Sequence, residues 1–363
     1  MQTGSQGASR LRALDVFRGL CIAAMILVNN PGPVEHPYSP LSHAEWIGWT
    51  FADTIFPSFL WIVGVAITLS SARRLERGDT RGRLAAHAVR RSALLLACGL
   101  FLDGFPRFDL ATWKVTGTLQ KIAAAYLIAY IIFLWTTWRG QVLGLLGILA
   151  ASLALMLWYP VPGCGPGSWT MDCNFARYLD GAVLAGHSGW TPGQSDPDGI
   201  LSVLSSTASV LFGILAGRLL LGLSEGARTP GLLISGVALV SAGELLSRAI
   251  PISKILWSPS YVFLMAGLSS IAFGVCYWAV QDVQAARWFR PFEVLGLNAI
   301  AAYVVSRLGA LPLKMHVLGT SIFDLLLNVA SPINASLLFA FVNLIMVFVV
   351  IWWMYYHRII IKF

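Results

Sequence analysis

The sequence predicts an all-α, polytopic integral membrane protein with about ten transmembrane helices, from its composition, its hydropathy pattern and its shortage of charge. Of the 363 residues, 57% are hydrophobic, and the mean hydropathy is +0.71. Charged residues make up 12% of the chain, about half of their share in soluble globular domains. A soluble fold has too small an interior to bury so much apolar surface. The composition therefore excludes a soluble domain.

Apolar stretches of roughly 17 to 25 residues follow one another along the chain, and each is long enough to cross a bilayer as a helix. We expect spans near residues 11–29, 54–72, 88–103, 118–136, 140–159, 199–221, 229–249, 259–281, 293–309 and 334–356. The stretch 311–330 is less apolar and suits a re-entrant or interfacial segment. No linker or low-complexity tract interrupts the series, so we expect residues 1–363 to form a single transmembrane domain.

The distribution of Lys and Arg predicts the orientation of these spans. With the N-terminus in the cytoplasm, the loops place 17 of the 25 basic residues on the cytoplasmic side and 8 on the other. Cytoplasmic loops carry such an excess, so we expect both termini inside and loops 30–53, 103–118 and 159–198 outside. The net charge of +8 is then a topology signal. It indicates a lipid environment and no nucleic-acid partner.

Two of the five cysteines, Cys164 and Cys173, lie in the outer loop 159–198. A disulfide between them and a pair of free thiols are both compatible with the sequence, because spacing alone does not fix the geometry of a disulfide. Cys21, Cys98 and Cys276 fall inside apolar stretches and are expected to be small core residues.

Loop 30–53 and its flanks hold the densest group of polar side chains in the chain and no Lys or Arg. The group comprises Asn29, Asn30, Glu35, His36, His43, Glu45 and Asp53. A histidine beside a carboxylate and two amides can act as a general base or as a nucleophile. The carboxylate keeps one ring nitrogen protonated, and the amides can stabilise an oxyanion. Asp53 also opens a span. The alternative interpretation is therefore that it is a helix cap with no catalytic role.

A metal site is the alternative for the same histidines and glutamates, but no further loop residue completes a ligand set. We therefore expect no metal.

Several sequence blocks resemble the heparan-α-glucosaminide N-acetyltransferase family. The first are RLRALDVFRGLCIAAMILVNNPG and PLSHAEWIGWTFADTIFPSFLWIVGVAI, followed in order by GTLQKIAAAYLI, DPDGILSVLSSTASVLFGILAGRLL, IPISKILWSPSYV and PFEVLGLNAIAAYVV. The pattern His-Ala-x-Trp-x-Gly-x-Thr-x-x-Asp-x-x-x-Pro, which begins at His43, is specific. The start Leu-Asp-x-Phe-Arg-Gly is less so, since other membrane acyltransferases carry a similar one.

The resemblance implies transfer of an acetyl group from cytoplasmic acetyl-CoA to a terminal glucosamine across the membrane. It places the family's catalytic histidine on His43 and its neighbouring polar positions on Asn29 and Asp53. The chain lacks the long lumenal N-terminal domain of the lysosomal enzyme, and the loop before His43 is rich in proline. We therefore expect a smaller or different amine than a heparan chain as the acceptor.

Other residues are candidates for the donor and acceptor sites. For acetyl-CoA we expect contacts from Asn30, Gln120, Lys121 and Asn298. For the acceptor we expect contacts from Trp46, Asp198, Lys254, Trp257 and Ser258, with Tyr303 a further pocket candidate. Arg73 to Arg91 form a basic run that either reflects topology alone or holds CoA phosphates. Asp15 and Arg18 form either a structural pair or a cofactor contact.

The sequence leaves two mechanisms open for an acetyltransferase. Either His43 deprotonates the acceptor in a ternary complex, or it carries the acetyl group itself in a ping-pong reaction. The function from a different class is a secondary transporter for amino sugars or their oligomers, which broken spans and polar helix ends also suit. We expect a bacterial cytoplasmic membrane, a periplasmic His43 loop and a homodimer.

Overall fold

The computed structural model describes residues 11–33, 37–184, 186–188, 195–314 and 322–361, with the side chains of 309–314 left out. The long helices are α1 (Arg12–Asn29), α2 (Phe51–Glu76), α3 (Arg81–Gly104), α4 (Thr118–Trp135), α5 (Trp138–Trp158), α7 (Ile200–Gly222), α8 (Glu225–Ser247), α9 (Pro259–Tyr277), α11 (Ala299–Lys314) and α13 (Pro332–Tyr356). The short ones are η1 (Ser39–Leu41), α6 (Phe175–Leu184), η2 (Trp278–Asp282), η3 (Ala285–Arg287), α10 (Arg290–Leu297) and α12 (Ile322–Leu327).

The all-α membrane class predicted from the sequence is confirmed. Within the described ranges, eight helices are long and apolar enough to cross a membrane, namely α2 to α5, α7 to α9 and α13. Helix α1 is as long as α4, but Arg12, Asp15 and Arg18 add charge to its first half. The number of ten spans stays a prediction, as does the single domain.

The predicted span 293–309 is not one helix, because it breaks at Asn298 into α10 and α11. The Asn298 side chain, 1% exposed, forms two hydrogen bonds with the C-terminal segment. Its Nδ2 donates to the carbonyl of Ile359 at 3.0 Å, and its Oδ1 accepts from the amide of Ile361 at 3.0 Å. At the break the Asn298 side chain therefore meets the C-terminal segment, and these two hydrogen bonds stabilise it in that place.

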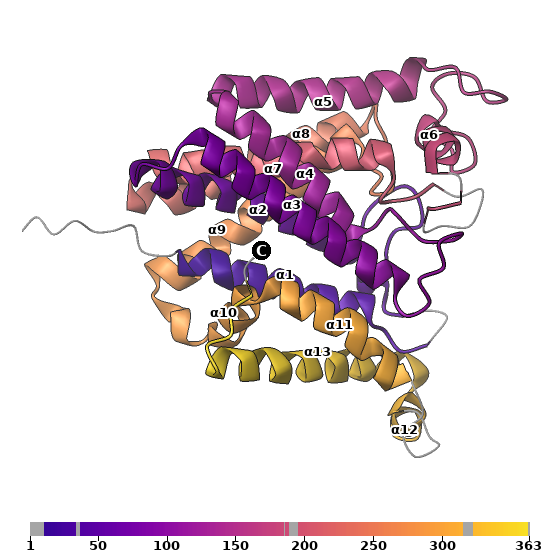
Figure 1. Ribbon diagram of the computed structural model, residues 1–363, viewed down its shortest axis with the longest axis vertical. Helices are drawn as coiled ribbons and strands as arrows, with labels where there is room; N and C mark the ends of the chain where they lie inside the picture. The colour runs from indigo at the N-terminus through magenta and orange to yellow at the C-terminus, as the bar shows by residue number, and fades with distance from the viewer. Residues whose placement is uncertain (1–10, 34–36, 185, 189–194, 315–321, 362–363) are drawn as a thin grey trace, which may run out of the picture.

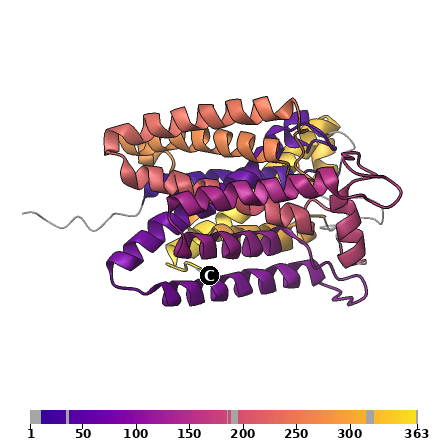
Figure 2. The same ribbon diagram turned by 90° about the horizontal axis from the view of Figure 1, so that it is seen from above.

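The helices form two groups, one on each side of a gap in which the site is found. Figure 1 shows α1, α10, α11 and α13 in a layer below α2 to α5 and α7 to α9. Figure 2 shows the upper group from above, with α8 and α3 at opposite edges. Close packing relies on glycine, since a Cβ at Gly64 of α2 would stand 2.0 Å from a carbonyl of α7. Gly296 is packed equally tightly against the Asp15 carbonyl of α1.

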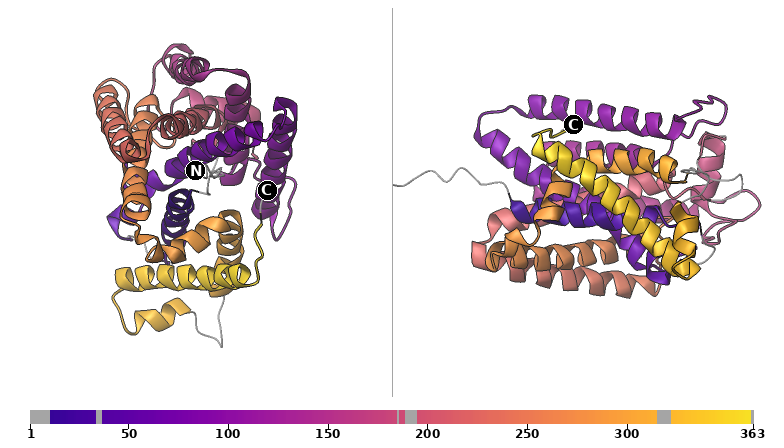
Figure 3. Two further views of the ribbon diagram at one scale, coloured as in Figure 1. Left: turned by 90° about the vertical axis from the view of Figure 1, so that its left-hand side faces the viewer. Right: turned by 90° about the horizontal axis from the view of Figure 1, so that it is seen from below.

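Loops of opposite predicted sidedness lie at opposite ends of the bundle. The connections α1–α2, α3–α4, α5–α7 and α8–α9 gather at the end where α6 lies, and α1 begins at the other end (Figures 1 and 3). Cys164 and Cys173 form a disulfide in the α5–α7 connection. This agrees with the disulfide alternative and suits an oxidising compartment at that end.

Candidate active site

Asp53 is fixed by the sequence that surrounds the N-terminus of α2. Thr50 is the N-cap residue, and Thr50 with Asp53 three residues later forms a capping box. Asp53 Oδ2 accepts from the Thr50 amide and from the Ala44 amide, both at 3.0 Å, and the carboxylate is fully buried. Asp53 is therefore a helix cap, as one of the two interpretations expected, but capping uses only one of its oxygens.

The other oxygen of Asp53 binds the predicted catalytic histidine. His43 Nδ1 lies 2.7 Å from Asp53 Oδ1. The loop that carries His43 is held by a hydrogen bond from Thr50 Oγ1 to the Ser42 carbonyl at 2.6 Å. The side chain of His43 remains 45% exposed. Burial of the carboxylate and exposure of the imidazole leave one edge of the ring open to a substrate.

Lys254, expected in the acceptor site, lies against both members of this pair. Its Nζ is 3.0 Å from Asp53 Oδ1 and 2.9 Å from His43 Nδ1. It comes from the α8–α9 connection, which Gly48 joins to the His43 loop through a hydrogen bond to the Ile252 carbonyl at 2.8 Å. Burial lowers the pKa of Lys254, and the neighbouring charge of Asp53 opposes that effect.

The two asparagines that end α1 differ in their environment. Asn29 is exposed, whereas Asn30 is buried and donates to the Ile26 carbonyl at 2.9 Å. No hydrogen bond joins Asn29 to His43, Asp53 or Lys254 among the described residues. The predicted role of Asn29 as oxyanion donor stays a prediction. Glu35 and His36 lie outside the described residues.

Lys121 and Trp257 form a buried cation–aromatic contact next to the His43 group. The Lys121 Nζ lies 3.7 Å from the centre of the Trp257 ring and donates to the Pro197 carbonyl at 2.8 Å. Phe56, on α2, packs edge-on against Trp257 with ring centres 5.7 Å apart. Ser258 accepts from the Ser253 amide at 3.1 Å, which fixes the turn that presents Trp257.

Asp198 and two other carboxylates surround the N-terminus of α7. Asp196 accepts from Thr116 Oγ1 at 2.6 Å, and Asp180 of α6 accepts from the Ile200 amide at 2.9 Å. Burial raises the pKa of Asp198, an effect that Lys121 opposes. Burial likewise raises the pKa of Asp180 to about 6. Trp46 is elsewhere in this outer region, where it donates to the Trp169 carbonyl at 2.8 Å.

A cavity of about 510 Å³ occupies the gap between the two helix groups. Its walls come from α1, α2, α3, α4, α10 and α11, and Ile361 of the C-terminal segment contributes too. On α2 the lining extends from Ile55 to Arg74, a rise of about 28 Å along a helix. The cavity lining therefore extends along α2 over a length close to the ~30 Å thickness of a hydrocarbon core.

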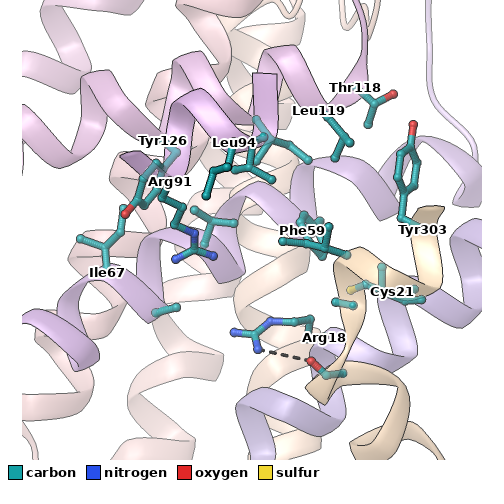
Figure 4. A pocket seen from close by; sticks show the side chains of 18 of the residues that line it. Arg18, Cys21, Phe59, Ile67, Arg91, Leu94, Thr118, Leu119, Tyr126 and Tyr303 are labelled. Atoms are coloured by element: carbon teal, nitrogen blue, oxygen red, sulfur yellow. Dashed lines mark hydrogen bonds between the residues drawn. The ribbon is translucent and has the colours of Figure 1, made fainter. Parts of the chain in front are cut away.

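The two ends of this cavity differ in chemistry. One end carries four cations, Arg18, Arg74, Arg90 and Arg91, and His87 lines the same end. Figure 4 shows the guanidinium groups of Arg18 and Arg91 turned into the space, away from the end marked by Thr118 and Tyr303. Arg91 lies over the Tyr126 ring at 5.0 Å, and its Nε has no hydrogen-bond partner among the described residues. The other end includes Ile55 and Phe56, just beyond Asp53 along α2.

None of the four residues predicted for the donor site, Asn30, Gln120, Lys121 and Asn298, is among the described residues that line this cavity. Lys121 contacts the cavity only through Phe56, which its Nζ approaches to 5.6 Å. Gln120 donates to Asp103 Oδ2 at 2.8 Å, and its neighbours Thr118 and Leu119 line the cavity instead. Asn298 lies between the lining residues Leu297 and Ala299, with both polar atoms bonded to the C-terminal segment.

The chain is similar in sequence to proteins of known function. Residues 10–170 match the family model described as the catalytic region of heparan-α-glucosaminide N-acetyltransferase. The mouse heparan-α-glucosaminide N-acetyltransferase is 29% identical over 84% of this chain and 54% of its own length. The human enzyme of that name is 31% identical over 81% of this chain and 52% of its own length. The chain is a relative of the heparan-α-glucosaminide N-acetyltransferases.

This result confirms the resemblance that the sequence blocks indicated. The chain spans about half the length of the mouse and human N-acetyltransferases that it matches. The part that matches the catalytic family model contains His43, Asp53 and four of the cavity helices, α1 to α4. Lys254 and Trp257 come from beyond that part, and the fold brings them to the same place.

Some features of the site could not be found from the sequence. Phe59, Leu94 and Tyr126 line the cavity, but an apolar residue in a membrane helix has the same appearance whether it faces a cavity, a helix or lipid. The Ala44 amide that binds Asp53 carries no side-chain signal at all. Among the described residues, no group of three or more His, Cys, Asp or Glu is placed to hold a metal ion.

Proposed function

We propose that this protein is a membrane-embedded N-acetyltransferase that passes acetyl from acetyl-CoA through the bilayer to an amine acceptor. The observation that carries the proposal is the cavity, which leads from a cluster of arginines to Ile55 and Phe56 of α2, two and three residues beyond Asp53, the partner of His43. The similarity to N-acetyltransferases supports it.

The residues around the cavity suit the parts of acetyl-CoA. Guanidinium groups bind phosphates through paired N–H donors, and those of Arg18 and Arg91 face the cavity (Figure 4). Phe59, Leu94 and Leu119 offer an apolar wall to the pantetheine arm. With the nucleotide at the arginine end, the thioester of an extended arm lies near Phe56 and His43. The donor then enters from the side that carries most of the basic residues, which we assign to the cytoplasm.

The acceptor meets the donor at the opposite side of the membrane. His43, whose ring is half exposed, takes a proton from the acceptor amine through Nε2 as the nitrogen attacks the thioester carbon. The new C–N bond replaces the C–S bond, and the proton passes on to the sulfur that leaves as CoA thiol. Asp53 holds Nδ1–H throughout. Asn29 is assigned to the oxyanion, and Asp198 to the ammonium form of the acceptor before it loses its proton.

The test uses purified protein in detergent with acetyl-CoA labelled in the acetyl group. We expect label to appear on glucosamine or on small amino-sugar oligomers, and to stay on the donor with the His43→Ala protein. The Asn29→Ala protein should lose ~10²-fold or more in turnover, the usual effect of one lost oxyanion donor. A wild-type protein that neither binds acetyl-CoA nor transfers label contradicts the proposal and makes amino-sugar transport the leading function.

A further inference from the structure

The position of Lys254 relative to the His43 ring is unusual for a hydrogen-bond partner. Its Nζ lies 2.9 Å from Nδ1 and 3.4 Å from Nε2. A partner that lay in the ring plane at Nδ1 would be far from Nε2, because the two nitrogens point to opposite edges of the ring. The similar distances therefore place Nζ over the face of the imidazole. The in-plane direction at Nδ1 is left to Asp53 Oδ1, 2.7 Å away.

This arrangement assigns the protons. Asp53 Oδ1 accepts from both the Nδ1–H of His43 and the ammonium of Lys254, which is 3.0 Å away. With its proton on Nδ1, the ring has an unprotonated Nε2, the nitrogen that must act as the base. A cation against the face of a neutral ring is attracted to it, whereas the same cation repels an imidazolium. Lys254 thus favours the neutral ring.

We propose that Lys254 is a positioning residue that shares Asp53 with His43 and holds the imidazole neutral, in the tautomer whose Nε2 can accept a proton. This role rests on the proposed acetyltransfer, and it differs from the contact with the acceptor expected from the sequence. An Asp–His pair on its own stabilises the protonated ring. A second cation on the same carboxylate offsets this stabilisation of the protonated ring, so the imidazole is neutral at the pH at which it must accept a proton.

The surrounding chain holds Lys254 in this place. The turn before α9 contains Ser253 and Ser258, which are both buried. The Ser253 amide donates a hydrogen bond to Ser258 Oγ across the turn. Trp257 has a positive φ of +50°, a conformation that costs energy for a non-glycine residue, and its Nε1 donates to Ser209 Oγ at 3.1 Å. A turn held by so many buried contacts is typical of a functional constraint on the residue that it presents.

Other charged groups besides His43 interact with Lys254. Asp53 and Asp198 both raise the pKa of Lys254, against the larger effect of burial. Lys121 is the second buried lysine in the region, and the charge of Lys254 acts on it. The charged groups that interact with Lys254 are thus Asp53, Asp198 and Lys121, and the loop of His43 itself carries the exposed Glu45. Asp53 Oδ1 and Lys254 Nζ lie 2.7 and 2.9 Å from His43 Nδ1.

The test compares Lys254→Met, Lys254→Arg and, as control, Arg107→Met, which removes an exposed cation from another outer loop. For each we would measure kcat/KM for acetyl transfer as a function of pH. In the Lys254→Met protein the acid limb should move to higher pH by about one unit or more, because the imidazolium no longer meets a neighbouring cation. The Lys254→Arg and Arg107→Met proteins should keep the wild-type limb.

Two results would overturn the role of Lys254. A profile that keeps its shape while the acceptor KM rises would assign the residue to acceptor binding. A uniform loss of kcat/KM at every pH that is the same in the Lys254→Arg protein would make the lysine purely structural. NMR of protein with ¹⁵N-labelled histidine, with the His43 signal assigned through His43→Ala, should show Nδ1 protonated and Nε2 free in the wild type. That measurement needs no activity, so it separates failure of this inference from failure of the proposed function.

Discussion

Lys121, on α4, inserts its ammonium group into a pocket formed by the turn before α9, at 3.7 Å from the centre of the Trp257 ring. The side chain is 1% exposed, so the charge is stabilised by the ring, by the Pro197 carbonyl and by Ser202 Oγ at 3.0 Å. One buried cation thus joins α4 to the segment before α7 and to the turn that carries Lys254.

Removing this cation should destabilise the outer end of the bundle. We expect Lys121→Met to lower the free energy of unfolding by ~3 kcal/mol, because the Pro197 carbonyl and the nearby carboxylates lose a buried counter-charge. The Tm of the purified protein in detergent measures this loss of stability. Arg139→Met is the matched control, since Arg139 also lies over a tryptophan ring, at 5.5 Å, but is exposed. Equal Tm values for Lys121→Met and wild type would contradict the stabilising role.

Asp53→Asn should abolish most of the turnover while preserving the fold. The asparagine oxygen can still accept from Ala44 and Thr50 in place of Oδ2. Its amide would then donate to Nδ1 and force the proton of His43 onto Nε2, the wrong tautomer for a base. We expect kcat to fall by ~10² to 10⁴-fold with an unchanged Kd for acetyl-CoA. Asp109→Asn, which alters an exposed carboxylate in the α3–α4 loop, should have no effect on either quantity.

Arginines at the basic end of the cavity should determine donor affinity. We expect Arg91→Ala to raise the Kd for acetyl-CoA by about 10 to 100-fold, the value of one hydrogen bond to a charged group. The Kd should increase with salt in the wild type and less steeply in the variant. Arg139→Ala removes an arginine outside the cavity lining and should bind like the wild type. Isothermal titration with each protein would decide, and equal affinities would exclude Arg91 from the donor site.

The parts of this molecule that could be predicted from sequence are those with local signals. Apolar length identified the spans, and the motif that begins at His43 placed the predicted catalytic residues His43 and Asp53 close to each other in the chain. The break at Asn298 was missed, because the hydrogen bonds that stabilise Asn298 there are made with Ile359 and Ile361, some sixty residues further along the chain. Lys254 was predicted for the site but not for its contact with His43, because 211 residues separate the two in sequence.

The C-terminal segment should form part of the donor site, because Ile361 lines the cavity and Asn298 holds its backbone. In a protein whose native cysteines are replaced except for the disulfide pair, Ile361→Cys should react with a maleimide more slowly when CoA is present. Ile359→Cys is the control, since Ile359 is similarly exposed but is not part of the lining. Adding Asn298→Leu should abolish the protection. Equal protection at both positions would show a general effect of CoA on the segment.

The stability of the outer region should depend on pH through Asp180. Burial raises the pKa of this carboxyl to about 6 in the folded protein, above its ordinary value near ~4. The folded state therefore binds the proton more tightly, and the free energy of unfolding falls as pH rises from about 4 to about 6. Asp180→Asn should remove this slope in a series of Tm measurements, while Asp109→Asn should retain it. A slope that persists in the Asp180→Asn protein would assign the pH dependence to another group, of which Asp198 is the first candidate because burial raises its pKa as well.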